Sequence, residues 1–179
     1  MRLGALFGVC ALVTFGRLAR AAADATVPGE SAPLFFVSKS ENKNQVSYAI
    51  RLDPECRPAG ETPVFAYWRM LERSPVAVEP LLALEEGAYG IGQQHTTLSG
   101  ESGGSVVLAL RSLPDRTIVV RTHRQGLTCV AEATTRIADL PARLFGVHAR
   151  LAWPFGVAAL EIAGWAQSDG HVVRETIRP

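Results

Sequence analysis

The chain has 179 residues, a formal net charge of +1 and 47% hydrophobic residues. This length suits a single domain with a substantial core. The balanced charge excludes the basic surface with which proteins bind nucleic acid or an acidic membrane, so no nucleic-acid partner is expected.

The first 23 residues resemble a secretory signal peptide. Arg2 precedes an apolar run from Leu3 to Phe15, and an alanine-rich stretch follows. This order is typical of export signals, and the run is shorter than the ~20 residues of a membrane span. We expect cleavage near Ala23, a periplasmic or secreted bacterial protein, and no transmembrane segment after the signal. An uncleaved N-terminal anchor is the alternative.

The mature chain divides into a short lead-in and one domain. Residues 24–33 are small and polar and contain prolines, which predicts a disordered lead-in, and residues 34–179 form the domain. Removal of residues 1–23 leaves 15 basic and 17 acidic residues and two cysteines, Cys56 and Cys129. In an oxidising compartment these two pair with each other or stay as free thiols.

A two-residue alternation of apolar and polar side chains dominates the domain and predicts strands. In residues 45–52, for example, Val46, Tyr48, Ile50 and Leu52 share one face. A strand is expected before the polar turn at 38–44, and others over residues 45–52, 64–71, 105–111, 117–123, 127–137, 144–153, 157–166 and 171–177. Gly126 and Gly170 occupy turn positions that favour positive φ.

One segment departs from this alternation. Pro80 and Gly87 bracket an apolar and acidic stretch, which predicts a short helix over residues 80–86. With about eight or nine strands and one helix, the fold class is all-β, an antiparallel barrel or sandwich.

The motif "GESGG" presents Ser102 between glycines, as hydrolases present a nucleophile. The α/β-hydrolase elbow needs a helix after the serine, and here a strand follows. A chymotrypsin-like triad needs a histidine far upstream, but in the mature chain only His95 precedes Ser102. Ser102 is therefore a weak catalytic candidate, and a glycine-rich loop is the favoured interpretation.

Neither a metal nor a cofactor is expected from the sequence. His95, His123, His148 and His171 are widely spaced and share no short interval typical of metal ligands. Glu132 and Glu161 lie on polar strand faces, and their spacing does not show whether they meet across a cleft.

The most distinctive polar cluster combines a turn with aromatic strands. Lys39, Asn42, Lys43 and Asn44 lie in the turn, and Tyr48, Tyr67 and Trp68 lie in the next two strands. Such a loop can hold a polar or anionic group against an aromatic wall. The alternative is that the asparagines shape the turn and the aromatic residues fill the core. Candidate ligand-binding residues are Lys39, Asn42, Asn44, Tyr48, Tyr67 and Trp68.

The same region carries a family resemblance. Short motifs follow one another along the chain: Ser40, Asn42 and Asn44 followed by Val46 and Tyr48, then Tyr67–Trp68, the "AYG" at 88–90, and a closing hairpin around Gly170 that ends in Glu175 and "IRP". In this order they resemble a bacterial family catalogued as domain of unknown function 4833. The resemblance covers residues 34–179 and implies an extracytoplasmic protein. It implies no activity and no site residues.

These observations favour a non-catalytic β-domain of the bacterial envelope that binds a small ligand or an envelope protein. A structural or interaction role in the envelope is the first alternative. A serine hydrolase that uses Ser102 is the second.

Overall fold

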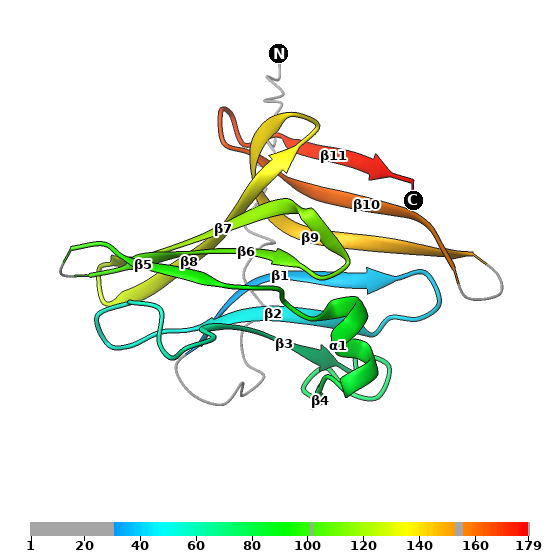
Figure 1. Cartoon of the computed structure of the whole chain (residues 1–179), viewed down its shortest axis with the longest axis horizontal. Coiled ribbons are helices and arrows are strands. Elements are labelled where there is room, and N and C mark those ends of the chain that lie inside the picture. Colours follow the sequence, from blue (N-terminus) through cyan, green and yellow to red (C-terminus); the bar gives the residue numbers. More distant parts are fainter. Residues whose placement is uncertain (1–30, 101, 153–155, 179) are drawn as a thin grey trace, which may run out of the picture.

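The computed structural model describes residues 31–100, 102–152 and 156–178, which form strands and one short helix (Figure 1). The expected signal peptide lies outside this range. The strands are β1 (Ser31–Lys39), β2 (Gln45–Arg51), β3 (Val64–Arg69), β4 (Val78–Pro80), β5 (His95–Leu98), β6 (Gly104–Leu110), β7 (Leu113–Gln125), β8 (Thr128–Ile137), β9 (Leu140–Ala152), β10 (Gly156–Ala166) and β11 (Val172–Ile177). The helix, α1, spans Ala83–Tyr89. The predicted all-β class with one short helix is confirmed.

The strands form one mixed sheet with the order β4-β3-β2-β1-β9-β8-β7-β6-β5, and β10 and β11 extend from β9. β10 pairs with β9 from Ala142 to Ala152. β8 pairs with Leu140–Arg143 and β1 pairs with Gly146–Ala149, so both share the opposite edge of β9. The sheet does not close into a barrel. The β1–β9 pairing is parallel, which corrects the expectation of a purely antiparallel sheet.

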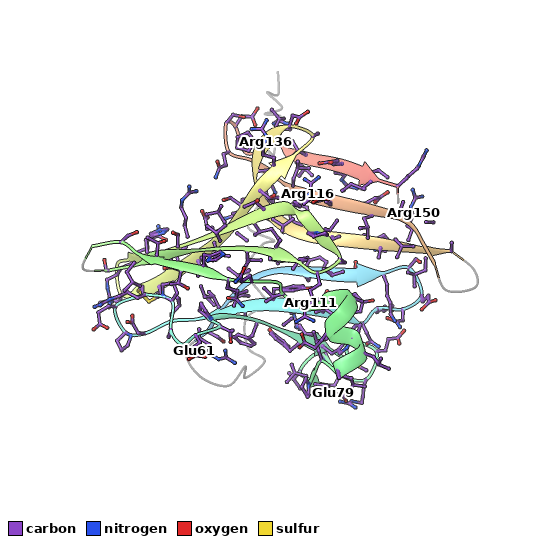
Figure 2. All side chains as sticks on the ribbon, viewed as in Figure 1. Glu61, Glu79, Arg111, Arg116, Arg136 and Arg150 are labelled. Atoms are coloured by element: carbon purple, nitrogen blue, oxygen red, sulfur yellow. A yellow bond between two sulfur atoms is a disulfide. The ribbon has the colours of Figure 1, made fainter. Side chains whose placement is uncertain are left out.

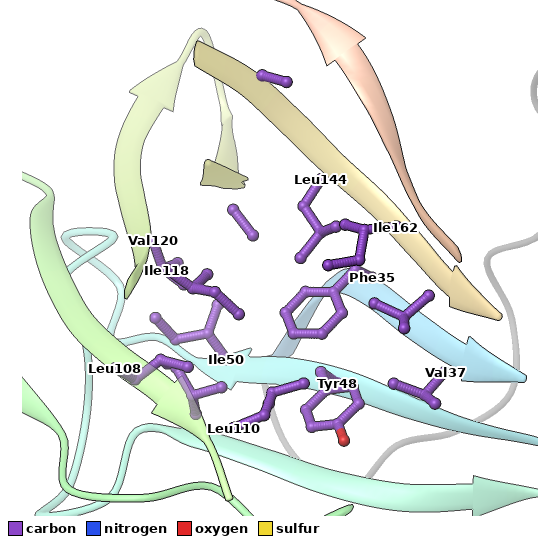
Figure 3. Packing of buried hydrophobic residues seen from close by; sticks show 14 of the residues in the cluster. Phe35, Val37, Tyr48, Ile50, Leu108, Leu110, Ile118, Val120, Leu144 and Ile162 are labelled. Carbon is purple, nitrogen blue, oxygen red and sulfur yellow. The ribbon is translucent and has the colours of Figure 1, made fainter. Parts of the chain in front are cut away.

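The core forms where the two halves of the folded sheet face each other (Figure 3). From β2, Val46, Tyr48 and Ile50 are buried, as the alternation predicted. Across the core lie buried side chains from β6, β7, β9 and β10: Val106, Leu108, Leu110, Ile118, Val120, Leu144, Val147 and Ile162. Burial of each large apolar side chain contributes roughly 1.5–3 kcal/mol, so this interface supplies most of the driving force for folding.

Some elements differ in position from those expected. β1 begins at Ser31, before the expected domain start at Leu34 and inside the segment 24–33 assigned to a lead-in. The helix begins at Ala83 rather than Pro80, because Pro80 ends β4 and the Glu85 carboxylate accepts the Leu82 N–H at 2.8 Å. Gly87 lies inside the helix, and Gly90 follows its end.

Other elements gave no clear sequence signal. β4 has 3 residues and ends in proline, and β5, "HTTL", is exposed along its whole length, so neither shows an alternating pattern. The β8–β9 turn places Ala138 and Asp139 at φ 48° and 64° without a glycine. Gly126 and Gly170 have positive φ in their hairpins, as predicted.

A disulfide holds the loop after β2 against the β7–β8 hairpin. Cys56 and Cys129 are bonded, with their Cα atoms 5.2 Å apart and a sequence separation of 73. The Gly103 N–H also donates to the Glu55 carbonyl at 3.0 Å, and Arg124 donates to the Pro54 carbonyl. The bridge therefore joins both layers of the fold at the end where the "GESGG" loop lies.

An ion pair between Arg116 and Glu175 joins β7 to β11. Arg116, in β7, donates two hydrogen bonds to the Glu175 carboxylate, at 2.7 and 3.1 Å, and the Ala138 N–H donates a third at 2.9 Å. Figure 2 places Arg116 and Arg136 close together in this region, where Arg116 also donates to the Arg136 carbonyl. Burial alone would raise the pKa of Glu175, but the hydrogen bonds from Arg116 and Ala138 and the Arg116 charge together lower it below 4.5.

Removal of the disulfide should lower stability without changing the fold. In the chain-entropy model, a bridge that closes a loop of this length contributes about 4 kcal/mol. We expect the Cys56→Ala, Cys129→Ala double variant to show this loss in guanidinium unfolding, and reduced wild-type protein to behave like it. An unchanged unfolding midpoint would contradict the stabilising role.

Glu175→Gln should destabilise the protein in a pH-dependent way. A carboxylate whose pKa is lowered by folding stabilises the native state above its ordinary pKa, and this contribution is lost as pH falls through the folded pKa. We expect a deficit of about 1–2 kcal/mol at about pH 7 that shrinks towards about pH 3, measured by urea unfolding. The control is Glu132→Gln, which removes the exposed Glu132–Arg143 pair and should cost less at either pH. A deficit independent of pH would count against the charge as its cause.

Candidate functional site

An open cavity of about 410 Å³ lies between the β1–β2 turn and the segment from β3 to α1. Its volume is within the roughly 300–1,000 Å³ of typical small-molecule sites. The lining residues are Lys39, Asn42, Asn44, Trp68, Met70, Glu79, Pro80, Leu82 and Glu85. Four of the six predicted ligand-binding residues are thus brought together: Lys39, Asn42, Asn44 and Trp68.

Lys39 and Trp68 reach the cavity from the ends of neighbouring strands. Trp68 pairs with Val46 across β2 and β3, and β2 in turn pairs with β1, which ends at Lys39. The Lys39 ammonium lies 5.6 Å from the centroid of the Trp68 ring, a cation–π contact. Its nearest carboxylate is that of Glu41, at 3.8 Å. The cation is therefore held at the edge of the cavity by weak contacts.

The two asparagines use their oxygens to shape the loops. The Asn42 side-chain oxygen accepts the Asn44 N–H at 3.1 Å, and the Asn44 side-chain oxygen accepts the Glu72 N–H at 3.1 Å. The second bond joins the β1–β2 turn to the loop after β3. Because the oxygens are engaged in this way, the amide NH₂ groups are the donors that these residues offer to the cavity.

Trp68 carries a buried polar atom without a partner. The residue is 9% exposed, and its indole Nε1 has no hydrogen-bond acceptor within the part of the chain that the structure describes. The ring packs edge-on against Tyr89, with centroids 5.4 Å apart. A buried N–H without an acceptor costs about 1–3 kcal/mol, and because almost no surface of Nε1 is accessible, the rest of the indole ring, rather than its N–H, forms the cavity wall.

Carboxylates line the side of the cavity formed by β4 and α1. Figure 2 shows Glu79 in this part of the molecule, and its carboxylate lies 2.6 Å from the Arg73 guanidinium. One Glu85 oxygen accepts the Leu82 N–H. Burial, together with the negative charges of Glu85 and Glu41, raises the pKa of Tyr89. This side of the cavity is therefore negatively charged.

Tyr48 and Tyr67 do not line the cavity. The Tyr48 ring stacks on Phe35 at 4.5 Å, and its hydroxyl donates to the Tyr89 carbonyl at 2.6 Å, so Tyr48 belongs to the core. Burial, with smaller contributions from Tyr89 and Glu86, raises its pKa. Tyr67 adjoins Trp68 in β3 and faces the other side of the sheet, where it packs against Phe65 at 5.9 Å.

Sequence reasoning missed Met70, Glu79, Pro80, Leu82 and Glu85 as lining residues. They lie in the loop after β3, in β4 and at the start of α1. The sequence carries no capping-box signal for Glu85, because the residue three positions before it is Leu82, which has no side-chain oxygen, rather than Ser or Thr.

A second cavity, of about 630 Å³, surrounds the Arg116–Glu175 pair. Ser112, Asp115, Thr135, Asp139 and Ile177 are among its lining residues. The hydrogen bonds of Arg116 and Glu175 are directed at each other and at nearby backbone groups, so the charges at the centre of this cavity are already paired within the protein.

Ser102 lies exposed in the loop between β5 and β6. Among residues 31–100, 102–152 and 156–178, no hydrogen bond joins its hydroxyl to a histidine. The neighbouring glycines serve packing: at Gly103, with φ +86°, a Cβ would lie 2.3 Å from the Thr122 carbonyl oxygen, and at Gly104 it would lie 2.9 Å from Pro58. The geometry of the loop thus accounts for Gly103 and Gly104, and these glycines need not serve a nucleophile.

A different serine contacts a histidine. Ser38 Oγ lies 3.0 Å from His148 Nδ1, and Glu161 is the direct neighbour of His148 on the next strand. The sequence did not reveal this pair, because it depends on the parallel register of β1 and β9. All three residues lie outside both cavities.

The histidines lie on different elements and do not form a cluster in the described part of the chain. His95 lies on β5, His123 on β7, and His171 contacts Asp169. In the described part of the chain, no group of three or more His, Cys, Asp or Glu side chains is placed to hold a metal ion. None of the helices described there is long and apolar enough to cross a membrane.

The fold and the cavity define a single-sheet, two-layered all-β domain with an open, polar, ligand-sized cavity. Residues 35–176 match the family described as a domain of unknown function (DUF4833), and the chain belongs to that family. The resemblance seen in the sequence is thereby confirmed. No curated protein and no solved structure matches the chain.

A fluorophosphonate probe, which labels activated serines, should leave the protein unlabelled. The reason is that Ser102 lacks a histidine contact and the Ser38–His148 pair lies outside both cavities. Labelling would be read by intact mass. Stoichiometric labelling lost in Ser102→Ala would support the hydrolase hypothesis, and labelling lost in Ser38→Ala would assign it to the other serine.

Proposed function

We propose that this domain is a non-catalytic binding module of an exported bacterial protein and that it holds a small polar ligand in the cavity lined by Lys39 and Trp68. The observation that carries the proposal is the Lys39 ammonium held beside the Trp68 ring at the edge of a cavity of ligand size. The amide groups of Asn42 and Asn44 add further donors. A ligand with acceptor groups would satisfy them together.

Export is supported by two separate features. Residues 1–23 have the order of charge, apolar run and small residues typical of a signal peptide. The Cys56–Cys129 disulfide is compatible with an oxidising compartment such as the periplasm.

A second candidate function is an interaction role in the envelope. On the outer face of β9 and β10, Phe145 packs against Trp165 at 4.4 Å, and the Arg143 guanidinium lies 4.6 Å from the Trp165 ring. Trp165 is 36% exposed. Exposed aromatic residues and arginine are enriched at protein interfaces, so this face is where a protein partner would be sought.

Native mass spectrometry of protein recovered from the producing bacterium tests the proposal. We expect a discrete extra mass that is lost on denaturation, and the denatured mass should place the N-terminus after cleavage near Ala23. Trp68→Phe replaces the indole by a smaller ring and weakens the cation–π contact that holds Lys39, so it should weaken the affinity for the ligand by about 2- to 30-fold.

The matched control is Trp165→Phe, which changes the exposed tryptophan outside the cavity and should keep the extra mass. A bare native mass for wild-type protein would sink the ligand proposal and favour the interaction role. An extra mass equally strong in Trp68→Phe would place the ligand elsewhere.

A further inference from the structure

We infer that the ligand of this cavity is a zwitterion of the amino-acid type, with an ammonium and a carboxylate on neighbouring atoms and an apolar side chain. The inference rests on the proposed function, because it assigns a chemical class to the ligand of the same cavity. It follows from the way in which donors, acceptors and apolar groups are distributed among the lining residues.

The donors of the cavity come from β1 and the β1–β2 turn. They are the Lys39 ammonium and the amide NH₂ groups of Asn42 and Asn44. The asparagine oxygens are already engaged by backbone N–H groups. A carboxylate supplies about four acceptor sites and the charge that complements Lys39.

The acceptors come from β4 and α1. Glu79 is paired with Arg73, whereas none of the ion pairs in the described part of the chain involves Glu85. Glu85 is half-buried, and one of its oxygens accepts the Leu82 N–H, which leaves the other oxygen available. An ammonium group would complement this carboxylate.

Counting the lining side chains decides between the classes of ligand. One cation, Lys39, stands against two carboxylates, Glu79 and Glu85. A ligand with only a negative charge would lie near the unpaired Glu85, and a ligand with only a positive charge would lie near Lys39, whose ion pair with the exposed Glu41 is weak. A zwitterion satisfies both sides without changing the net charge of the site.

Apolar groups complete the lining. Met70, Pro80 and Leu82 also line the cavity, and Leu82 is 68% exposed. An apolar side chain of the ligand would cover part of this surface, at about 25 cal/mol per Å² of apolar area removed from water. Amino acids with aliphatic side chains combine all three features.

Calorimetric titration with three related probes tests the inference. L-leucine carries both charges, L-leucinamide lacks the carboxylate, and N-acetyl-L-leucine lacks the ammonium. We expect L-leucine to bind at least about tenfold more tightly than either analogue, since each loses a charge-assisted contact worth about 1.5–3 kcal/mol.

Four variants assign the two ends of the ligand. Lys39→Met should weaken L-leucine while leaving L-leucinamide unchanged, and Glu85→Gln should weaken L-leucine while leaving N-acetyl-L-leucine unchanged. Glutamine can still accept the Leu82 N–H, so the helix start is retained. The controls Lys43→Met and Glu86→Gln change exposed neighbours outside the cavity and should bind L-leucine as wild type does. Thermal unfolding checks that each variant is folded.

Each remaining outcome overturns the inference in a distinguishable way. Equal binding of N-acetyl-L-leucine and L-leucine would exclude the ammonium contact, and equal binding of L-leucinamide would exclude the carboxylate contact. If no probe binds but the native protein carries an extra mass that depends on Trp68, the zwitterion is wrong and the proposed function stands. If neither is found, both are wrong.

Discussion

Backbone hydrogen bonding along both edges of β9 holds this domain together. A buried strand has to pair its N–H and C=O groups, and β9 does so with β10 on one edge and with β8 and then β1 on the other. The pairing with β1 joins the β2–β3–β4 half of the sheet to the β5–β8 half, so that their apolar faces meet in one core. Lys39, at the end of β1, reaches the cavity through the pairing of β1 with β2 and of β2 with β3.

Local patterns in the sequence were sufficient for much of the fold. The alternation of Val46, Tyr48 and Ile50 identified a buried face, and Gly126 and Gly170 marked two hairpins. The direction of β1 relative to β9 could not be predicted, because the side-chain period of a strand is the same in parallel and antiparallel pairs. β5 was missed because its exposed residues, "HTTL", carry no apolar face.

Part of the candidate site could be predicted from the sequence for a related reason. Lys39, Asn42 and Asn44 lie within one turn, so their proximity is local, and Trp68 follows two strands later in the same meander. Tyr48 lies in the core and not at the cavity, which the sequence could not show, because aromatic residues in strands carry the same signal whether they face the core or a cavity. Glu85 and Leu82 enter the site through the position of α1, whose last residue, Tyr89, accepts a hydrogen bond from Tyr48. A core residue thus contacts the helix that forms one wall of the cavity.

The parallel pairing also determines the order in which the domain can be assembled. Ser38 and His148, neighbours on β1 and β9, are 110 residues apart in the chain. As the chain is synthesised, β1 can pair with β2 at once, but its other edge has no partner until β9 follows. Contacts of such long range form slowly. The two halves of the sheet can therefore join only after most of the domain has been made.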